Sequence, residues 1–412
     1  MDAIALFDPA SSGLPLKKAA RDLGYKVICI FTHSMKSYKR IYRVTSEALF
    51  SDCDEVIESD DKEEIVRKLK ASKYTIKASI AATEGGVELA EQVADALGLV
   101  TNPIELSEAR RDKGEMRRFF KKSGLSCPDF ALCSSEDEVR QFASTHSFPL
   151  VIKTPKGAST CQVFVCEDLD ELLKGYRDIL GQEDLFGHFA KRAVVEDYIS
   201  GKEYIVDTFS DGEKIHVTDV WYYDKIESAN FKNIYYNIIS LPLTDPHLKN
   251  LMEYAVKAAK YFRVQFGTAH IEIKDDPKRG PTLIEIGARL PGVRLPMYIQ
   301  KFSNFDPYRA TIEVFTKGKT SVPEPIVYSK HIAVVFCPSL LGGKIQKILG
   351  LDHIRKLSSY QDHLVNVQEG DTVSPSTYIG TTLCFVFLAH ESREQLFQDM
   401  EKAHELFTVE FF

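Results

Sequence analysis

The chain has 412 residues, of which 44% are hydrophobic and 27% charged. Its length favours two to three domains, and its composition is that of a globular protein without large disordered regions. The net charge is −7 and no basic block stands out, which disfavours nucleic acid as a partner. No secretory signal is visible, and no apolar run approaches the ~20 residues that cross a bilayer, so we expect no membrane partner.

The eight cysteines are scattered along the chain without a CxxC pair. This pattern disfavours both a zinc site and a disulfide scaffold, and it favours a reducing compartment. We therefore expect a cytoplasmic protein.

The first 105 residues alternate between strand and helix patterns, which is typical of a parallel sheet. The loop from Asp8 to Gly13 precedes the first helix and could hold an anion there. It lacks GxGxxG, and a plain tight turn is the alternative. The sequence predicts strands at 3–7, 27–31, 77–82 and 99–100, and helices at 14–23, 61–71 and 87–96.

The next segment contains two candidate phosphate-binding lysines. Ser107 is predicted to cap an amphipathic helix that contains Lys113 near its start and ends at Gly124. A strand at 149–153 ends in Lys153, and the polar loop that follows leads to a second strand at 162–166. This arrangement suits a flap that folds over phosphates. A plain hairpin and a solvated helix lysine are the alternatives.

Two carboxylates flank the next chain crossing. An apolar strand reaches Glu196, a short connection ends at Gly201, and a second strand begins at Glu203. Carboxylates in this position could accept hydrogen bonds from a base amino group or ribose hydroxyls, or they could simply be solvated. A strand meander follows, then a helix at 246–262.

The stretch 266–292 carries the most specific pattern. Two short alternating runs flank a turn-rich stretch, which predicts a β-hairpin. Because residues i and i+2 share a face of a strand, His270 and Glu272 point the same way, and Glu285 faces the same surface from the second strand. Two carboxylates aimed at one surface favour a cation between them, and Arg289 just beyond the strand favours a Mg²⁺–phosphate site. A solvated hairpin face is the alternative.

The Pro-Glu-Pro linker at 323–325 leads into a last domain. Strands are predicted at 331–337, 364–367 and 382–388, followed by a helix at 392–405. The five histidines of this region are spread out, which favours structural or surface roles for them. We expect no catalytic residue here.

These segments together resemble the ATP-grasp superfamily of carboxylate–amine ligases, and most closely its L-amino acid ligase branch. The resemblance covers nearly the whole chain. It is carried in order by DPASSG at 8–13, the Lys113 helix, VIK at 151–153, VVEDYISGKEYIVD at 194–207, HIEI at 270–273, LIEIGARLPG at 283–292 and FCPSLLGGKI at 336–345.

The resemblance implies an α/β fold with α+β subdomains. An open parallel α/β domain would span 1–105, an ATP-grasp domain 106–315 and an α+β domain 316–412. The ATP-grasp domain would have a small lobe at about 125–195 and a large lobe at about 196–315.

The resemblance also implies roles for single residues. The phosphates of ATP would be bound by Lys113, Lys153, Gly157 and Ser159. Adenine would be held by Glu196 and the backbone of Asp197, Tyr198 and Ile199, and the ribose by Glu203. Mg²⁺, with two ions expected and Mn²⁺ as an alternative, would be bound by Glu272 and Glu285. Arg289 would stabilise an acyl phosphate. His270 would be a base or a contact to a substrate carboxylate, with a packed, hydrogen-bonded histidine as the alternative.

The implied activity is that of a ligase that forms carbon–nitrogen bonds. ATP phosphorylates a substrate carboxylate, and an amine then displaces phosphate to give an amide or peptide. Small-molecule carboxylates and amines are the expected partners, and a homodimer is left open. Specificity is predicted to lie in 221–241 and after Arg289.

Two departures from the family pattern leave alternatives open. The phosphate loop keeps only Gly157, and Gly287 stands where the superfamily commonly has a third metal ligand, Asn. A purine-pathway or carboxylase-type ligase, a kinase-like relative and a degenerate ATP-binding regulatory module therefore remain alternatives. The intact lysines, glutamates and Arg289 favour an active ligase.

Overall fold

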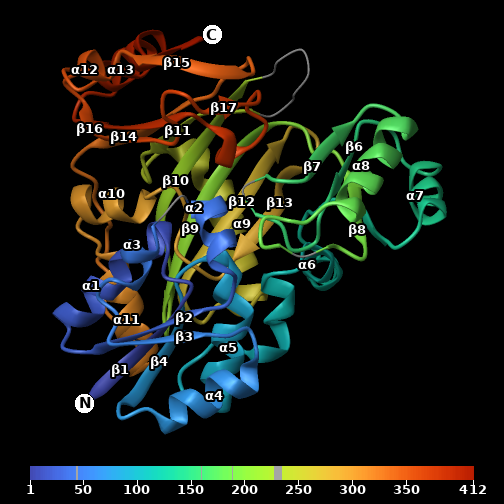
Figure 1. The fold of residues 1–412 in the computed structure, drawn as a ribbon. Helices are drawn as coiled ribbons and strands as arrows, with labels where there is room; N and C mark the ends of the chain where they lie inside the picture. The colour runs from blue at the N-terminus through green and yellow to red at the C-terminus, as the bar shows by residue number, and fades with distance from the viewer. Residues whose placement is uncertain (43–44, 159, 188, 227–233) are drawn as a thin grey trace.

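The computed structural model describes the chain from residue 1 to 412, except residues 43–44, 159, 188 and 227–233 (Figure 1). Within the described residues, the strands form four sheets, of which the largest has eight strands. None of the described helices has the length and apolar character needed to span a membrane.

The N-terminal sheet is parallel and has the order β3-β2-β1-β4, as the alternating pattern predicts. Its strands carry apolar side chains on both faces, which helices cover. The predicted strand at 99–100 is wrong, since these residues lie in a connection. The elements are β1 (Asp2–Phe7), α1 (Pro15–Asp22), β2 (Lys26–Phe31), α2 (Met35–Tyr42), α3 (Ser46–Phe50), β3 (Glu55–Glu58), α4 (Lys62–Ala71), β4 (Thr75–Ala81) and α5 (Val87–Ala96).

One disulfide departs from the expectation drawn from the cysteines. Cys29 of β2 bonds to Cys53 just before β3, and their Cα atoms are 5.9 Å apart. No CxxC spacing marks this pair, because the parallel pairing of β2 with β3 brings the two residues together.

The segment 104–124 is broken into short helices, so the predicted continuous helix from Ser107 is wrong. The Ser107 hydroxyl donates to Glu91 instead of capping a helix. Asp112 caps the real helix, accepting from the backbone of Gly114 and Glu115. The elements are η3 (Ile104–Leu106), η4 (Glu108–Arg110), α6 (Lys113–Phe120) and η5 (Lys121–Ser123), before Gly124 in the left-handed region.

A small antiparallel sheet of order β5-β8-β6-β7 projects to one side of the molecule (Figure 1). Ser135 and Asp168 cap its two helices, which pack on one face through a buried apolar cluster. The elements are β5 (Phe130–Cys133), α7 (Glu136–Ala143), β6 (Leu150–Lys153), β7 (Val163–Cys166), α8 (Leu169–Gly181) and β8 (Ala193–Asp197).

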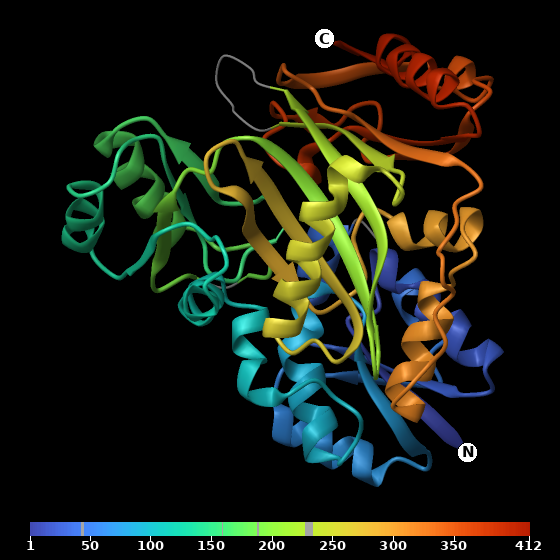
Figure 2. The ribbon, with the colours of Figure 1, turned by 180° about the vertical axis from the view of Figure 1, so that it is seen from behind.

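The eight-stranded sheet has the order β13-β12-β9-β10-β11-β14-β18-β16. Helix α9 packs on one face, and α10 and α11 pack on the other (Figure 2). The elements are β9 (Lys202–Asp211), β10 (Ile215–Ile226), β11 (Ile234–Leu241), η6 (Pro246–Leu248), α9 (Lys249–Tyr261), β12 (Phe266–Asp276), β13 (Gly280–Gly287), α10 (Leu295–Phe302) and α11 (Pro307–Lys317).

The C-terminal segment extends this same sheet, so β14 pairs with β11. The predicted division into three domains stays a prediction. The elements are β14 (His331–Cys337), β15 (Gly343–Leu349), α12 (Leu351–Ile354), β16 (Tyr360–Val365), β17 (Thr372–Val373), η7 (Ile379–Thr381), β18 (Cys384–His390), α13 (Arg393–Leu406) and β19 (Thr408–Phe411).

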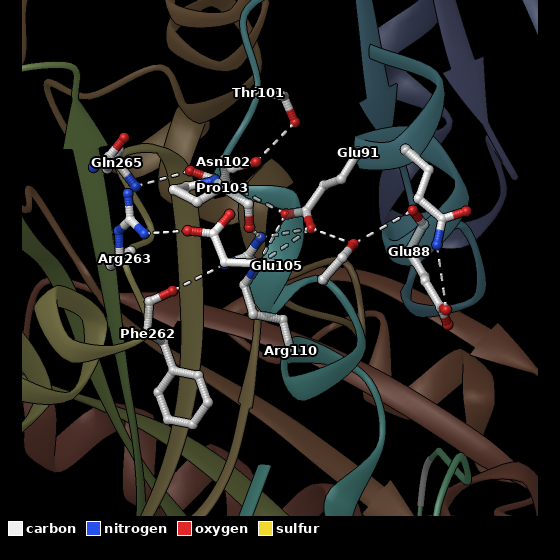
Figure 3. A network of polar contacts seen from close by, with 12 residues as sticks. Glu88, Glu91, Thr101, Asn102, Pro103, Glu105, Arg110, Phe262, Arg263 and Gln265 are labelled. Atoms are coloured by element: carbon white, nitrogen blue, oxygen red, sulfur yellow. Dashed lines mark hydrogen bonds and ion pairs between the residues drawn. The ribbon is translucent and has the colours of Figure 1, made fainter. Parts of the chain in front are cut away.

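A buried network joins the N-terminal sheet to the large one (Figure 3). Arg110 is fully buried and donates to both carboxylate oxygens of Glu91 on α5. It also donates to the carbonyl oxygens of Phe262 and Pro103. Since a buried guanidinium needs all these partners, the network fixes the N-terminal loops beside the large sheet.

Candidate active site

A cavity of about 810 Å³ lies where the N-terminal loops, the small sheet, the large sheet and the C-terminal segment meet. Most of the predicted site residues line it. Ser159 lies outside the described residues, so its predicted role remains untested.

The hairpin β12–β13 places two carboxylates on the cavity wall. Glu272 and Glu285 are cross-strand partners, while Ile271 and Ile286 are buried on the opposite face. The register shifts after this pair, so Ile273 opposes Leu283. Ile284 is thus the extra residue of a β-bulge and lines the cavity with Glu285, instead of lying on the apolar face as the alternation predicts.

Cations surround both carboxylates. The Lys113 Nζ lies 2.8 Å from Glu285 Oε1, and His270 Nε2 lies 3.7 Å from Glu272 Oε1. Burial alone would raise the pKa of Glu272, but hydrogen bonding and the charge of His270 outweigh it and lower that pKa to about 2. Both carboxylates therefore face positive charge at neutral pH.

A buried acidic pair stands behind His270. Its Nδ1 lies 2.7 Å from Asp207 Oδ1, and although burial lowers the pKa of His270, the Asp207 charge raises it to about 9. Asp219 is the cross-strand neighbour of Asp207 and accepts from Trp221 Nε1 and the Thr218 hydroxyl. Burial and the charge of Asp207 raise the pKa of Asp219 well above its usual range.

A proton on Asp219 resolves an otherwise unsatisfied atom. Asp207 Oδ2 is buried and has no hydrogen-bond donor among the ordinary protonation states. A protonated Asp219 can donate to it, because two buried carboxylates side by side cannot both ionise cheaply. Sequence reasoning missed Asp207 and Asp219, since each is one polar residue in a strand and only the β9–β10 register unites them.

The predicted phosphate lysines lie at the base of the loop between β6 and β7. Lys113 Nζ donates to the carbonyl oxygen of Gly157, 2.9 Å away, as well as to Glu285. Arg111 donates to the same carbonyl and to that of Lys156. The loop backbone is thus held by cations next to the two hairpin carboxylates.

The second lysine belongs to a buried triad. Lys153 Nζ is 2.5 Å from Glu196 Oε1, and Arg117 Nε is 3.0 Å from Glu196 Oε2. Burial raises the pKa of Glu196, but the charges of Arg117 and Lys153 more than offset this and lower it. Both oxygens of Glu196 are engaged by cations, so a base held here would be contacted mainly by the backbone that follows. Arg117 was missed, since it sits in a helix rich in Lys and Arg.

The strand connection after Glu196 forms the adjoining wall. Arg279 pairs with Asp197, and Lys274 donates to the carbonyl of Ile199 while its Nζ lies 4.6 Å from the centre of the Tyr198 ring. Glu203 is buried between two ammonium groups, with Lys225 Nζ at 2.8 Å and Lys274 Nζ at 3.9 Å.

Arg289 is buried beside an acidic residue of the N-terminal region. Its Nε lies 2.5 Å from Glu84 Oε2, and Arg111 Nη1 lies 3.9 Å from Glu84 Oε1. Burial raises the pKa of Glu84, but Arg289 and Arg111 lower it below its ordinary value. Glu84 was missed, because the sequence places it 205 residues from its partner. A Cβ at Gly287 would approach Glu84 Oε2 to 3.0 Å, so glycine leaves room for this pair.

The donor set fits a hard divalent cation that also binds phosphate oxygens. Among the described residues, no group of three or more His, Cys, Asp or Glu is arranged to hold a metal ion alone. Magnesium commonly uses only one or two carboxylates and takes its other ligands from water and phosphate. Glu272 and Glu285 match this requirement, with lysines close enough to hold the phosphates.

The predicted specificity segment is only partly described. Tyr223, Tyr235 and Ile238 line the cavity, whereas Trp221 is buried in the core. Residues 227–233 of this segment lie outside the described part of the chain.

Comparisons with known proteins agree with this geometry. Residues 146–296 match the family model described as an ATP-grasp domain. Dapdiamide A synthase of Enterobacter agglomerans is 29% identical over 302 residues, covering 73% of this chain and 70% of that protein. The L-arginine-specific L-amino acid ligase of Bacillus subtilis is 21% identical over 304 residues, covering 73% and 71%.

The fold comparison extends over the whole chain. The crystal structure of an L-amino acid ligase from Bacillus licheniformis superimposes with a TM-score of 0.81 at 18% identity, covering 100% of this chain and 99% of that one. The family match, the sequence relatives and this superposition together identify the chain as an ATP-grasp protein of the carboxylate–amine ligase type.

Proposed function

We propose that the chain joins an amino acid, or a similar carboxylate, to an amine in a reaction driven by ATP. The substrate carboxylate attacks the γ-phosphorus of ATP, the bond from that phosphorus to the β,γ-bridging oxygen breaks, and an acyl phosphate and ADP result. The amine nitrogen then attacks the acyl carbon, the carbon–oxygen bond to phosphate breaks, and an amide forms with loss of a proton. The observation that carries this proposal is the pair Glu272–Glu285 with Lys113 and Arg289 around one cavity.

Each residue answers a physical demand of that reaction. Lys113 and Lys153 lie where they can neutralise phosphate oxygens, and Glu203 is buried where it can accept ribose hydroxyls. The backbone at Asp197–Ile199 offers donors and acceptors to adenine. Glu272 and Glu285 would hold Mg²⁺, which supplies charge neutralisation for the transferring phosphoryl group when it is bound.

Arg289 and His270 face the carbon that reacts. The Arg289 guanidinium, held by Glu84, can donate to the carboxylate oxygen during phosphorylation and to the developing oxyanion during amine attack. His270, held by Asp207, carries a proton on Nε2 toward the cavity and can orient a substrate carboxylate. A histidine with a pKa raised to about 9 is a donor at neutral pH, so this arrangement favours the carboxylate contact over the base.

An ADP-release screen tests the proposal. The protein is incubated with ATP, Mg²⁺ and pairs of amino acids or other carboxylates, and ADP and product masses are measured together. Release of ADP that requires both members of a pair, with a product mass equal to their sum less one water, is the expected result. ADP release with a carboxylate alone, or an amine requirement without an amide product, would refute it.

A further inference from the structure

The cavity continues beyond the carboxylates into an aromatic wall. The Tyr223 hydroxyl lies 3.4 Å from Glu272 Oε1, and its ring packs edge-on against Tyr235 with centroids 4.9 Å apart. Tyr235 contacts Phe336 at 5.8 Å, and Phe336 packs against Phe385 at 5.1 Å. Aromatic side chains therefore run without a break from the proposed metal ligand to strand β18.

The C-terminal segment supplies neutral side chains to this wall. Leu364 of β16, Ile379 of η7, and Phe385 and Phe387 of β18 line the cavity. Within residues 331–412, all of which the structure describes, no charged side chain lines it. The segment for which sequence reasoning found no role thus forms one side of the cavity.

The cations nearest this wall are already paired. Lys225 Nζ lies 2.8 Å from Glu203 and 4.4 Å from the centre of the Tyr235 ring. Arg294 Nη1 lies 2.9 Å from Asp362, and its guanidinium lies 5.6 Å from the centre of the Phe387 ring. A charged substrate side chain placed here would lose water without gaining a free counter-charge, which is costly.

We propose that this wall is a side-chain subsite for an amino acid with a neutral aliphatic or aromatic side chain, and that the C-terminal segment selects it. The inference rests on the proposed ligase function for the choice of an amino acid as the ligand. It goes further in stating the class of side chain and in assigning the selection to Leu364 and Ile379.

Binding of single amino acids tests the subsite without requiring amide formation. The full-length protein with Mg²⁺ and ADP is titrated calorimetrically with phenylalanine, leucine, glutamate and lysine. We expect phenylalanine and leucine to bind ~10-fold or more tightly than glutamate and lysine, since even one methylene in an apolar pocket is worth about that factor.

Two variants at separate elements locate the selection. Leu364→Asp and Ile379→Asp place a carboxylate at partly buried positions of the wall, and each should weaken phenylalanine binding ~10-fold or more while ADP binding stays unchanged. The matched control is Leu340→Asp, at a half-exposed leucine of the same segment that does not line the cavity. It should change neither affinity.

The outcomes separate this inference from the ligase proposal. If phenylalanine and leucine fail to bind, if glutamate or lysine binds as tightly, or if both wall variants keep wild-type affinity for phenylalanine, the subsite is wrong, whatever the ligase assay gives. If the selectivity and its loss appear while no pair of substrates yields an amide, the subsite stands and the ligase proposal fails.

Discussion

Replacing Arg289 with lysine tests how the site handles developing negative charge. The substitution keeps the positive charge next to Glu84, so the buried carboxylate is not left unpaired. It removes the planar fork that can donate to two oxygens at once. The expected defect is therefore in the reaction and not in folding.

The magnitude follows from the burial of the pair. The Arg289 side chain is 17% exposed and that of Glu84 is 7%, so this is no surface ion pair of about 0–1 kcal/mol. A fixed donor aimed at charge that develops in a transition state is worth ~2.7–4 kcal/mol, or roughly 10²–10³ in rate. We expect Arg289→Lys to lose ~10²-fold or more in amide formation, with ATP affinity and urea midpoint near those of the wild type.

The matched control is Arg279→Lys, at an exposed arginine that pairs with Asp197. It should keep most of the amide-forming rate. If Arg289→Lys also retained a rate within a few-fold of wild type, Arg289 would be a structural residue and the charge-stabilising role assigned to it would be wrong.

Three further variants probe the carboxylates and a buried histidine. Glu272→Gln should abolish ADP formation, because it removes a negative ligand from a hard-cation site; near-normal turnover at low Mg²⁺ would contradict this. Asp219→Asn should leave amide formation and unfolding free energy near wild type, because the carboxyl is already protonated, whereas Asp219→Ala should cost ~1–3 kcal/mol by leaving buried groups unsatisfied; equal losses in urea denaturation would argue for an ionised Asp219. His404 stacks on Tyr236, and burial lowers its pKa from 6.5 to about 4, so its neutral form is favoured on folding. Stability should therefore be complete above pH 6.5 and fall by up to about 3 kcal/mol as the pH drops through 4, a loss that His404→Phe should reduce in pH-dependent denaturation.

The alternating strand patterns carried most of the fold and much of the candidate site. The hairpin, its facing carboxylates and the parallel N-terminal sheet follow from local periodicity, which is a property of neighbouring residues. The helix predicted from Ser107 failed because Asp112 is the better cap in place and Ser107 is drawn to Glu91.

The remaining site residues depend on contacts between distant parts of the chain. Glu84 meets Arg289 only because the N-terminal loops are docked on the large sheet, and Asp207 meets Asp219 only through strand register. Arg117 looked like one more cation on a basic helix until Glu196 was placed beside it. No local pattern marks such pairs, because each member is ordinary in its own sequence context.

Transfer of oxygen from the carboxylate to phosphate tests the central claim most directly. A substrate carboxylate labelled with ¹⁸O at both oxygens is turned over with ATP and the amine, and the released phosphate and the amide are examined by mass spectrometry. An acyl phosphate requires that one labelled oxygen leave with phosphate while the other stays in the amide carbonyl. Phosphate without label, together with a labelled amide, would contradict carboxylate activation at this site.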